Sequence, residues 1–136
     1  MALRQTYLSM KKKLPSDTEY VLVMHGRGND ELTASQDLLD DFNAWRTRFE
    51  LGQGFANEHD FAWEKSDYER RFRAQIAADP KAQARLKQLA ERSRGEDIFL
   101  ICYEADDKPC HRKLLLQIAE ETYGASIDPS PFRPAG

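Results

Sequence analysis

The sequence has few cysteines, no long apolar run and little net charge, and each shortage excludes a class of protein. Two cysteines in 136 residues are too few for the disulfide framework of a small secreted domain, so we expect both thiols to be reduced. No apolar run approaches the roughly 20 residues that span a bilayer. The N-terminus also lacks the apolar core of a signal peptide. We therefore expect a cytoplasmic protein with no membrane partner.

The charges are nearly balanced, with 20 Lys and Arg against 23 Asp and Glu, and a net charge of −3. This balance gives no general attraction for nucleic acid, although Lys11, Lys12 and Lys13 or the arginines near residue 71 leave a local basic patch open. The sequence also has no glycine-rich nucleotide loop, serine elbow or HExxH motif. Most of the known nucleotide and hydrolase signatures are therefore excluded.

What is present is a pattern typical of one α/β domain with a small, mostly parallel central sheet flanked by helices. We expect the domain to cover residues 1–127 and a proline-rich, extended and mobile tail to cover residues 128–136. Predicted strands cover 4–9 at the sheet edge, 19–25 with both faces covered, and 97–103 at the centre. Predicted helices cover about 36–50, 66–78, 80–94 and 110–123, and the segment 51–65 is predicted to be a loop packed against the body.

Local signals mark the ends of these helices. Ser35 and Asp79 precede apolar periodic segments as N-caps, and Pro80 suits a first helical position. The Ser66-Asp67-Tyr68-Glu69 segment has the form of a capping box. Gly124 is placed to end the last helix.

The residues with reactive side chains gather where the predicted central strand hands over to the last helix. The strand ends with Cys102 and Glu104, and Cys110, His111 and Arg112 open the helix after a short acidic loop. In α/β proteins, binding sites lie at the carboxyl ends of the strands. The amides and dipole of a helix N-terminus favour anions and lower the pKa of a thiol. We therefore place the candidate site at 102–112.

The residue types at this junction bear on two chemistries, a cysteine phosphatase and a zinc site. A phosphatase is excluded, because the residues after Cys102 carry carboxylates and no glycine to gather backbone amides around a phosphate. Zinc suits Cys102, Cys110 and His111, with His25 or His59 as a further ligand. However, the C-x7-C-H spacing matches no standard zinc module, and adjacent side chains on a helix point apart. We assign no metal ligand and no cofactor, and keep a zinc-stabilised domain as an alternative.

Glu104 and His111 are spaced to act as a general acid/base pair across the loop, with Arg112 fixing a phosphate or carboxylate of a substrate. Two structural alternatives stay open. Glu104 and Arg112 can form an ion pair that staples the loop to the helix. Cys110 can be a small buried apolar side chain.

The segment Leu100-Ile-Cys-Tyr-Glu, followed by Cys110-His-Arg-Lys-Leu-Leu, resembles the signature of the family known as domain of unknown function 488. Weaker agreement comes from other segments in the same order: 6–15, 34–39 and 63–72. Two departures are Ala34, where the family has proline, and the His-Gly-Arg ending at Arg27, where many members have Asp-x-Arg.

The resemblance implies a site made of Glu104, Cys110, His111 and Arg112, with Cys102 in support and Arg27 at its edge. It implies no activity. We expect a small enzyme acting on a phosphorylated or nucleotide-like substrate. In it Cys110 is the nucleophile or its support, His111 the acid/base and Glu104 the orienting carboxylate, while Arg112, Cys102 and Arg27 bind substrate. The alternative is a non-catalytic module that binds a nucleotide, a nucleic acid end or a protein partner through the same junction.

Overall fold

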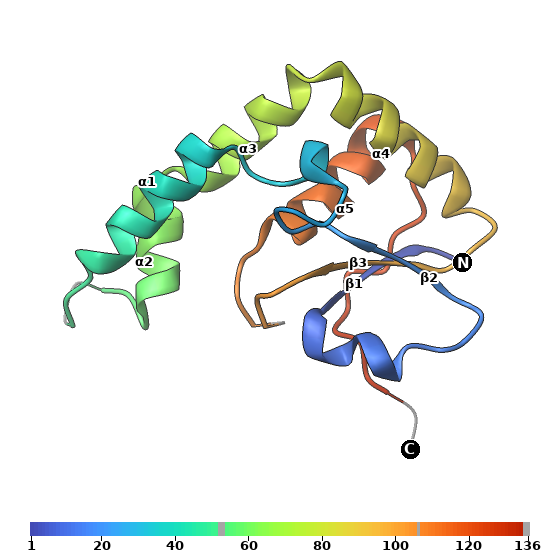
Figure 1. Ribbon diagram of the computed structural model, residues 1–136, viewed down its shortest axis with the longest axis horizontal. Helices are drawn as coiled ribbons and strands as arrows, with labels where there is room; N and C mark the ends of the chain where they lie inside the picture. Colours follow the sequence, from blue (N-terminus) through green and yellow to red (C-terminus); the bar gives the residue numbers. More distant parts are fainter. Residues whose placement is uncertain (52–53, 106, 135–136) are drawn as a thin grey trace.

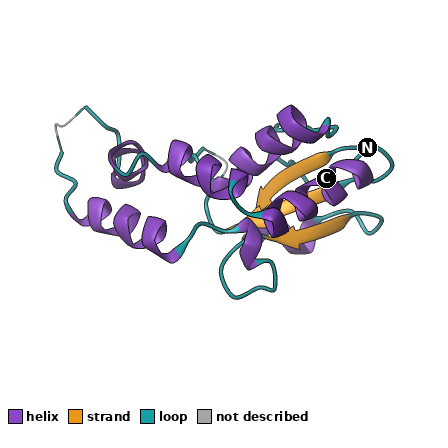
Figure 2. Ribbon diagram, turned by 90° about the horizontal axis from the view of Figure 1, so that it is seen from above, coloured by secondary structure: helices purple, strands orange, loops and turns teal. Residues whose placement is uncertain are grey.

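The computed structural model describes residues 1–51, 54–105 and 107–134. Three parallel strands form one sheet in the order β1-β3-β2, with β1 at Leu3–Tyr7, β2 at Glu19–Leu22 and β3 at Ile98–Cys102. Helices surround this sheet (Figure 2). The predicted α/β class, with a small parallel sheet and the strand near residue 100 at its centre, is confirmed.

The central strand β3 explains why the candidate site lies where it does. All five of its residues are buried, as its uninterrupted apolar run predicts. In the register of the sheet, Tyr7 of β1 pairs with Cys102, and the Val23 N–H continues the ladder by donating to the Ile101 carbonyl at 2.9 Å. The carboxyl ends of all three strands therefore meet near Cys102.

The strand β2 is shorter and more exposed than its sequence predicts. It lies at a sheet edge and ends at Leu22, and both Glu19 and Tyr20 are exposed. The expectation of a strand over 19–25 with both faces covered is wrong. Its apolar pattern cannot tell an edge strand from a central one, and here the Tyr20 ring is covered only by the Lys11 ammonium, 4.7 Å from the ring centroid.

Five α-helices and two short 3-10 segments complete the described fold (Figure 1). The helices α1, α2 and the start of α3 form an arm beside the sheet, α4 and α5 pack together above it, and η1 lies below it (Figure 1). Their bounds are η1 Leu8–Lys13, η2 Asp30–Leu32, α1 Gln36–Thr47, α2 Glu58–Lys65, α3 Tyr68–Ala77, α4 Pro80–Arg92 and α5 His111–Tyr123.

The helix ends agree with three of the four local signals. The Ser35 hydroxyl accepts the Leu38 N–H, the Asp79 carboxylate accepts the Lys81 N–H, and Gly124 ends α5 with φ of +68°. The apolar faces of α3, α4 and α5 are buried as predicted: Tyr68, Phe72, Ile76; Leu86, Leu89, Ala90; Leu114, Leu115, Ile118.

Two expectations between α1 and α3 are wrong. The predicted loop over 51–65 contains α2, which starts at the N-cap Asn57, whose side chain accepts the Asp60 N–H. The predicted capping box is absent, because the Ser66 hydroxyl donates to the Ala62 carbonyl of α2 instead. Asp67 precedes α3 with φ of +55° and no side-chain cap. These residues form a tight α2–α3 corner that positions the arm.

The C-terminal segment lies along β1. The Leu3 N–H donates to the Ser126 carbonyl at 2.7 Å, and the Asp128 N–H donates to the Leu3 carbonyl at 2.9 Å. The Phe132 ring packs edge-on against Phe99, with 5.2 Å between centroids. The described part of the tail therefore contacts the face of the sheet opposite α5.

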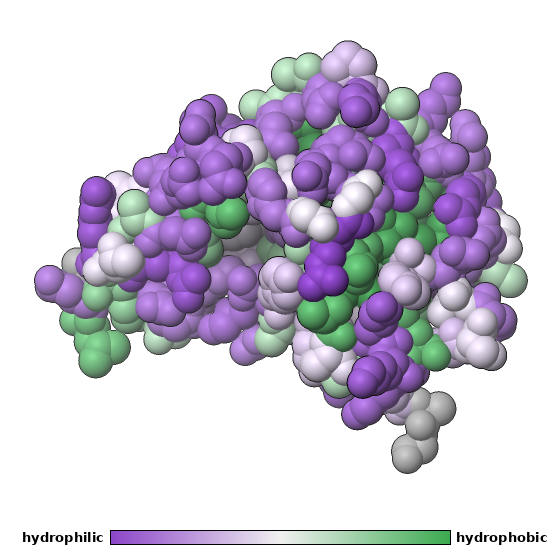
Figure 3. Space-filling view, viewed as in Figure 1, coloured by the Kyte–Doolittle hydropathy of each residue, from purple (hydrophilic) through white to green (hydrophobic). Residues whose placement is uncertain are grey.

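No helix within the described ranges is long and apolar enough to cross a membrane. Figure 3 shows a face that is largely hydrophilic over the helices, with apolar side chains visible over the sheet.

Candidate functional site

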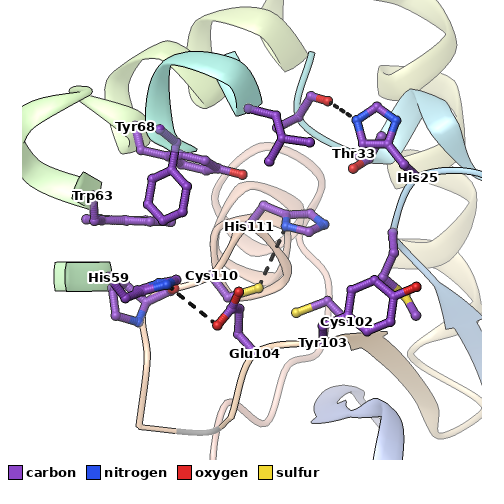
Figure 4. A pocket seen from close by; sticks show the side chains of 15 residues that line it. His25, Thr33, His59, Trp63, Tyr68, Cys102, Tyr103, Glu104, Cys110 and His111 are labelled. Atoms are coloured by element: carbon purple, nitrogen blue, oxygen red, sulfur yellow. Dashed lines mark hydrogen bonds and ion pairs between the residues drawn. The ribbon is translucent and has the colours of Figure 1, made fainter. Parts of the chain in front are cut away.

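A pocket of about 320 Å³ opens at the carboxyl end of β3, between the sheet, the start of α5 and the helical arm (Figure 4). Its walls are mostly apolar and aromatic, with polar side chains on more than one side (Figure 4). The lining residues are Met24, His25, Thr33, Ala34, Leu39, Phe42, His59, Trp63, Tyr68, Cys102, Tyr103, Glu104, Pro109, Cys110 and His111. The site predicted at 102–112 therefore lies beside a pocket, with four of its six residues in the wall.

Two sulfurs and an imidazole meet at the floor of this pocket. One ligand atom from each of Cys102, Cys110 and His111 lies within 4.8 Å of the others. Both cysteines are free thiols and nearly fully buried. Because β3 ends at Cys102 and α5 begins directly after Cys110, the intervening loop returns the second sulfur to the first.

The contact between Cys110 and His111 corrects an expectation from the sequence. Cys110 Sγ lies 3.7 Å from His111 Nδ1, although neighbouring side chains on a helix point apart. Cys110 is not helical. It is the N-cap of α5, with extended backbone angles of φ −155° and ψ 151°, so its side chain is free to turn toward the ring.

The hydrogen bonds of His111 fix its tautomer. Nε2 lies 2.6 Å from the Val23 carbonyl oxygen, which can only accept, so Nε2 carries the hydrogen. Burial lowers the pKa of His111, which favours the neutral ring. Nδ1 therefore presents a lone pair to Cys110, as a general base requires.

Arg112 is fully buried beneath the two sulfurs. It donates from Nε to the Gln5 side-chain oxygen at 2.7 Å, and from one terminal nitrogen to Cys102 Sγ at 2.7 Å and to the Glu104 carbonyl at 2.5 Å. Its guanidinium faces protein acceptors and is absent from the pocket wall. The geometry therefore gives no support to the expected contact between Arg112 and an anionic substrate.

Arg112, Cys102 and Cys110 form a hydrogen-bonded chain that separates the pKa values of the two thiols. The hydrogen bond to Cys110, together with burial, raises the pKa of the Cys102 thiol well above its usual range. Burial also opposes ionisation of Cys110. The Cys102 hydrogen bond and the charge and backbone amide of Arg112 outweigh it and lower the pKa of Cys110. Ionisation is therefore favoured at Cys110 over Cys102, and Cys102 is the neutral donor.

Glu104 does not form the side-chain ion pair with Arg112 that one alternative predicts. Its main-chain carbonyl accepts from Arg112, while its carboxylate lies 3.5 Å from His59 Nδ1. His59 Nε2 lies 2.7 Å from the Pro109 carbonyl oxygen. His59 therefore ties α2 to both ends of the 103–109 loop.

An aromatic wall stands opposite the sulfurs. The rings of Trp63 and Tyr68 stack at 4.2 Å, and Phe42 meets Tyr68 edge-on at 5.5 Å. Burial raises the pKa of Tyr68 above its usual range, so its hydroxyl is a neutral donor, and Figure 4 shows it pointing into the pocket. The sequence predicts Tyr68 only as a core residue. The i, i+4 spacing of His59 and Trp63 is a sequence signal that could have indicated α2 and this wall.

The remaining predicted site residue, Arg27, lies at the rim. Its guanidinium is 3.4 Å from the hydroxyl of Tyr103, which is itself exposed and lines the pocket. His25, from the same loop, lines the pocket and holds the Ala34 carbonyl oxygen through Nε2 at 2.9 Å. Arg27 is thus next to the pocket opening without lining it.

The candidate site thus lies at the carboxyl edge of a parallel sheet, where α/β proteins commonly bind ligands. Residues 34–122 match the model of the active DUF488-N3 subclade, DUF488-N3a, and the chain belongs to this family. The matched segment contains Cys102, Glu104 and Cys110 through Arg112. No curated protein and no solved structure matches the chain.

Proposed function

We propose that the protein is a small enzyme that uses Cys110 as a nucleophile on a phosphorylated or nucleotide-like substrate. The single observation that carries this proposal is the position of Cys110 Sγ in the wall of a 320 Å³ pocket, 3.7 Å from the Nδ1 lone pair of His111. Activation of a thiol by an adjacent base and a positive charge is the usual requirement of covalent catalysis by cysteine.

The proposed reaction has two steps. Cys110 Sγ bonds to the electrophilic atom of the substrate as the bond to the leaving group breaks, and His111 Nδ1, holding the thiol proton, returns it to the leaving group. Water then attacks the covalent intermediate, with His111 taking the proton of the water and the Cys110 sulfur leaving. Cys102 stabilises the thiolate before and after this cycle by donating its hydrogen.

The substrate class follows from the walls. Aromatic side chains line one side of the pocket, and its volume is small for a ligand pocket. Both features suit a single flat ring of nucleobase size. Arg27 at the opening is the cation placed to meet a phosphate attached to that ring. Arg112 supplies its charge to the sulfurs, and Glu104 keeps His59 in the wall.

Alkylation by iodoacetamide as a function of pH tests the nucleophile. The midpoint of the labelling rate against pH should lie lower for Cys110 than for a free thiol, whose midpoint is about pH 8.5. At pH 7, Cys110 should be labelled faster than free cysteine. Labelling should disappear in Cys110→Ser, persist in Cys102→Ser with a higher midpoint, and slow when a nucleoside monophosphate fills the pocket. A thiol that is inert in the folded chain would refute the nucleophile. If the nucleotide still binds, the binding-module alternative holds.

A zinc site is the second candidate, because one observation favours it directly. Cys102, Cys110 and His111 offer three ligand atoms within 4.8 Å, and the Nε2 hydrogen of His111 is held by the Val23 carbonyl, as is usual for a zinc-bound histidine. Three protein ligands beside an open pocket match a catalytic site. This candidate requires about one zinc per chain in protein purified without chelator, and its loss in Cys102→Ser. Clearly substoichiometric zinc in the wild type would exclude it.

A further inference from the structure

We propose that Cys102 and Cys110 are a redox pair: a peroxide oxidises Cys110, and Cys102 resolves the product as a reversible intramolecular disulfide. The inference deepens the proposed function, and rests on it only in taking Cys110 as the reactive sulfur. It assigns Cys102 a role that nucleophilic catalysis alone does not need.

The first observation is the position of the two sulfurs. They lie in one cluster, joined by a hydrogen bond, and both line the same pocket. A small oxidant can therefore reach Cys110 through the pocket. Both side chains are otherwise buried, at 1% and 3% exposure, so a bulky external thiol cannot easily reach an oxidised Cys110. Cys102 is the thiol that can.

The second observation is that both cysteines lie at the ends of their elements, with their sulfurs in one cluster. A disulfide needs the sulfurs to close to about 2.05 Å, with both side chains turned toward each other. The Cys110 carbonyl accepts the Lys113 and Leu114 N–H groups, but its side chain makes no capping hydrogen bond, so rotation of the side chain leaves these backbone hydrogen bonds of α5 in place. Cys102 is the last residue of β3 and Cys110 is the N-cap of α5, so each sulfur lies at the end of its element.

The third observation is the direction of the electrostatics. Arg112 donates to Cys102 Sγ at 2.7 Å and lies at the start of α5, so one buried positive charge lies against the pair. Such surroundings favour thiolate character, on which oxidation by peroxide depends. Removal of the Arg112 guanidinium would reduce the thiolate character of the pair while both sulfurs stay in the chain.

The chemistry balances with hydrogen peroxide as oxidant. The Cys110 thiolate attacks one peroxide oxygen, the O–O bond breaks, and sulfenic acid and hydroxide form. Cys102 Sγ then attacks the sulfenic sulfur, the S–O bond breaks, and the Cys102 proton leaves with that oxygen as water. A dithiol reductant reverses the result by thiol–disulfide exchange. While the disulfide exists, Cys110 has no thiol or thiolate that can act as a nucleophile.

The experiment treats reduced, purified full-length protein with a small excess of hydrogen peroxide and measures intact mass and free thiols without reductant. We expect a mass loss of about 2 Da, no free thiol, a linked 102–110 peptide pair, and full recovery with dithiothreitol. In Cys102→Ser, and in Cys102→Ala if the serine variant does not fold, Cys110 should over-oxidise and gain about 32 Da that dithiothreitol does not remove. Cys110→Ser should keep a reduced Cys102.

Sulfinic acid at Cys110 in the wild type, or a disulfide between two chains, would overturn the redox pair. Iodoacetamide labelling of the reduced protein at pH 7, run in parallel, separates the two proposals. Fast labelling without an internal disulfide leaves the enzyme proposal standing and ends this one. An internal disulfide in a protein whose reduced Cys110 is not labelled ends the enzyme proposal alone.

Discussion

Replacement of Arg112 by methionine is the sharpest perturbation of this molecule, because one buried guanidinium donates to Gln5, Cys102 and the Glu104 carbonyl at once. Methionine keeps much of the volume and removes the charge. The substitution deprives the Glu104 carbonyl and the Gln5 side-chain oxygen of a charged donor, each bond contributing about 1.5–3 kcal/mol. The loss of these two hydrogen bonds agrees with the range of about 3–5 kcal/mol for removing one partner of a buried ionic contact. We therefore expect the free energy of unfolding to fall by about 3–5 kcal/mol.

Urea unfolding followed by tryptophan fluorescence measures this loss. Arg73→Met is the matched control, since Arg73 is partly exposed and pairs with Glu69 and Glu121 on the helix surface, where such pairs contribute about 0–1 kcal/mol. Arg112→Lys keeps the charge but loses the forked set of guanidinium donors. Its loss of unfolding free energy should therefore lie between those of Arg112→Met and Arg73→Met. In Arg112→Lys, the alkylation midpoint of Cys110 should also rise, because the donor to Cys102 is lost. A loss below 1 kcal/mol for Arg112→Met would refute this account of the site.

Three further changes test other parts of the structure. The lowered pKa of His111 means that the unfolded chain takes up a proton below about pH 6.5 that the folded chain does not, so stability falls as the pH drops through that value, by at most about 1.4 kcal/mol per pH unit. His111→Gln, which keeps a donor for Val23, should remove this part of the slope between pH 7 and 5, and an unchanged slope would contradict the buried neutral ring. Gly124→Ala, at φ +68°, should cost about 1 kcal/mol in urea unfolding, whereas Gly95→Ala, with open space and no positive φ, should be close to neutral. Ser35→Ala should lower the unfolding free energy by about 1 kcal/mol through loss of the α1 cap, and no change would mean that water replaces it.

The sequence predicts the frame of the site well, because that frame depends on local signals. The short apolar run before Cys102 favours a buried strand, and periodic apolar residues followed by glycine are typical of the helix that became α5. Their order along the chain is enough to bring Cys102 and Cys110 together at a carboxyl edge. The α2 helix escaped prediction because its eight residues have only a weakly one-sided apolar pattern, between Glu58 and Lys65.

The orientation of individual side chains could not be predicted. Whether Cys110 points toward His111 depends on its extended backbone at the N-cap, which the residue type does not determine. The same holds for Arg112: a cation at a helix start suggests an anion contact, but the guanidinium donates to Gln5, to Cys102 and to the carbonyls of Glu104 and Ala105, which come from distant parts of the chain. The aromatic wall depends on how α2 and α3 meet, which is a tertiary property.

The strand-like contact between the tail and Leu3 has a consequence for how the molecule behaves among its copies. An outer strand of a sheet offers unpaired amides and carbonyls on which a foreign chain can grow a new strand. Here both backbone groups of Leu3 are already taken by Ser126 and Asp128 of the same chain. A shortened chain ending before Ser126 would therefore leave the backbone groups of Leu3 unpaired at the sheet edge. We expect such a chain to aggregate on storage before it loses the pocket.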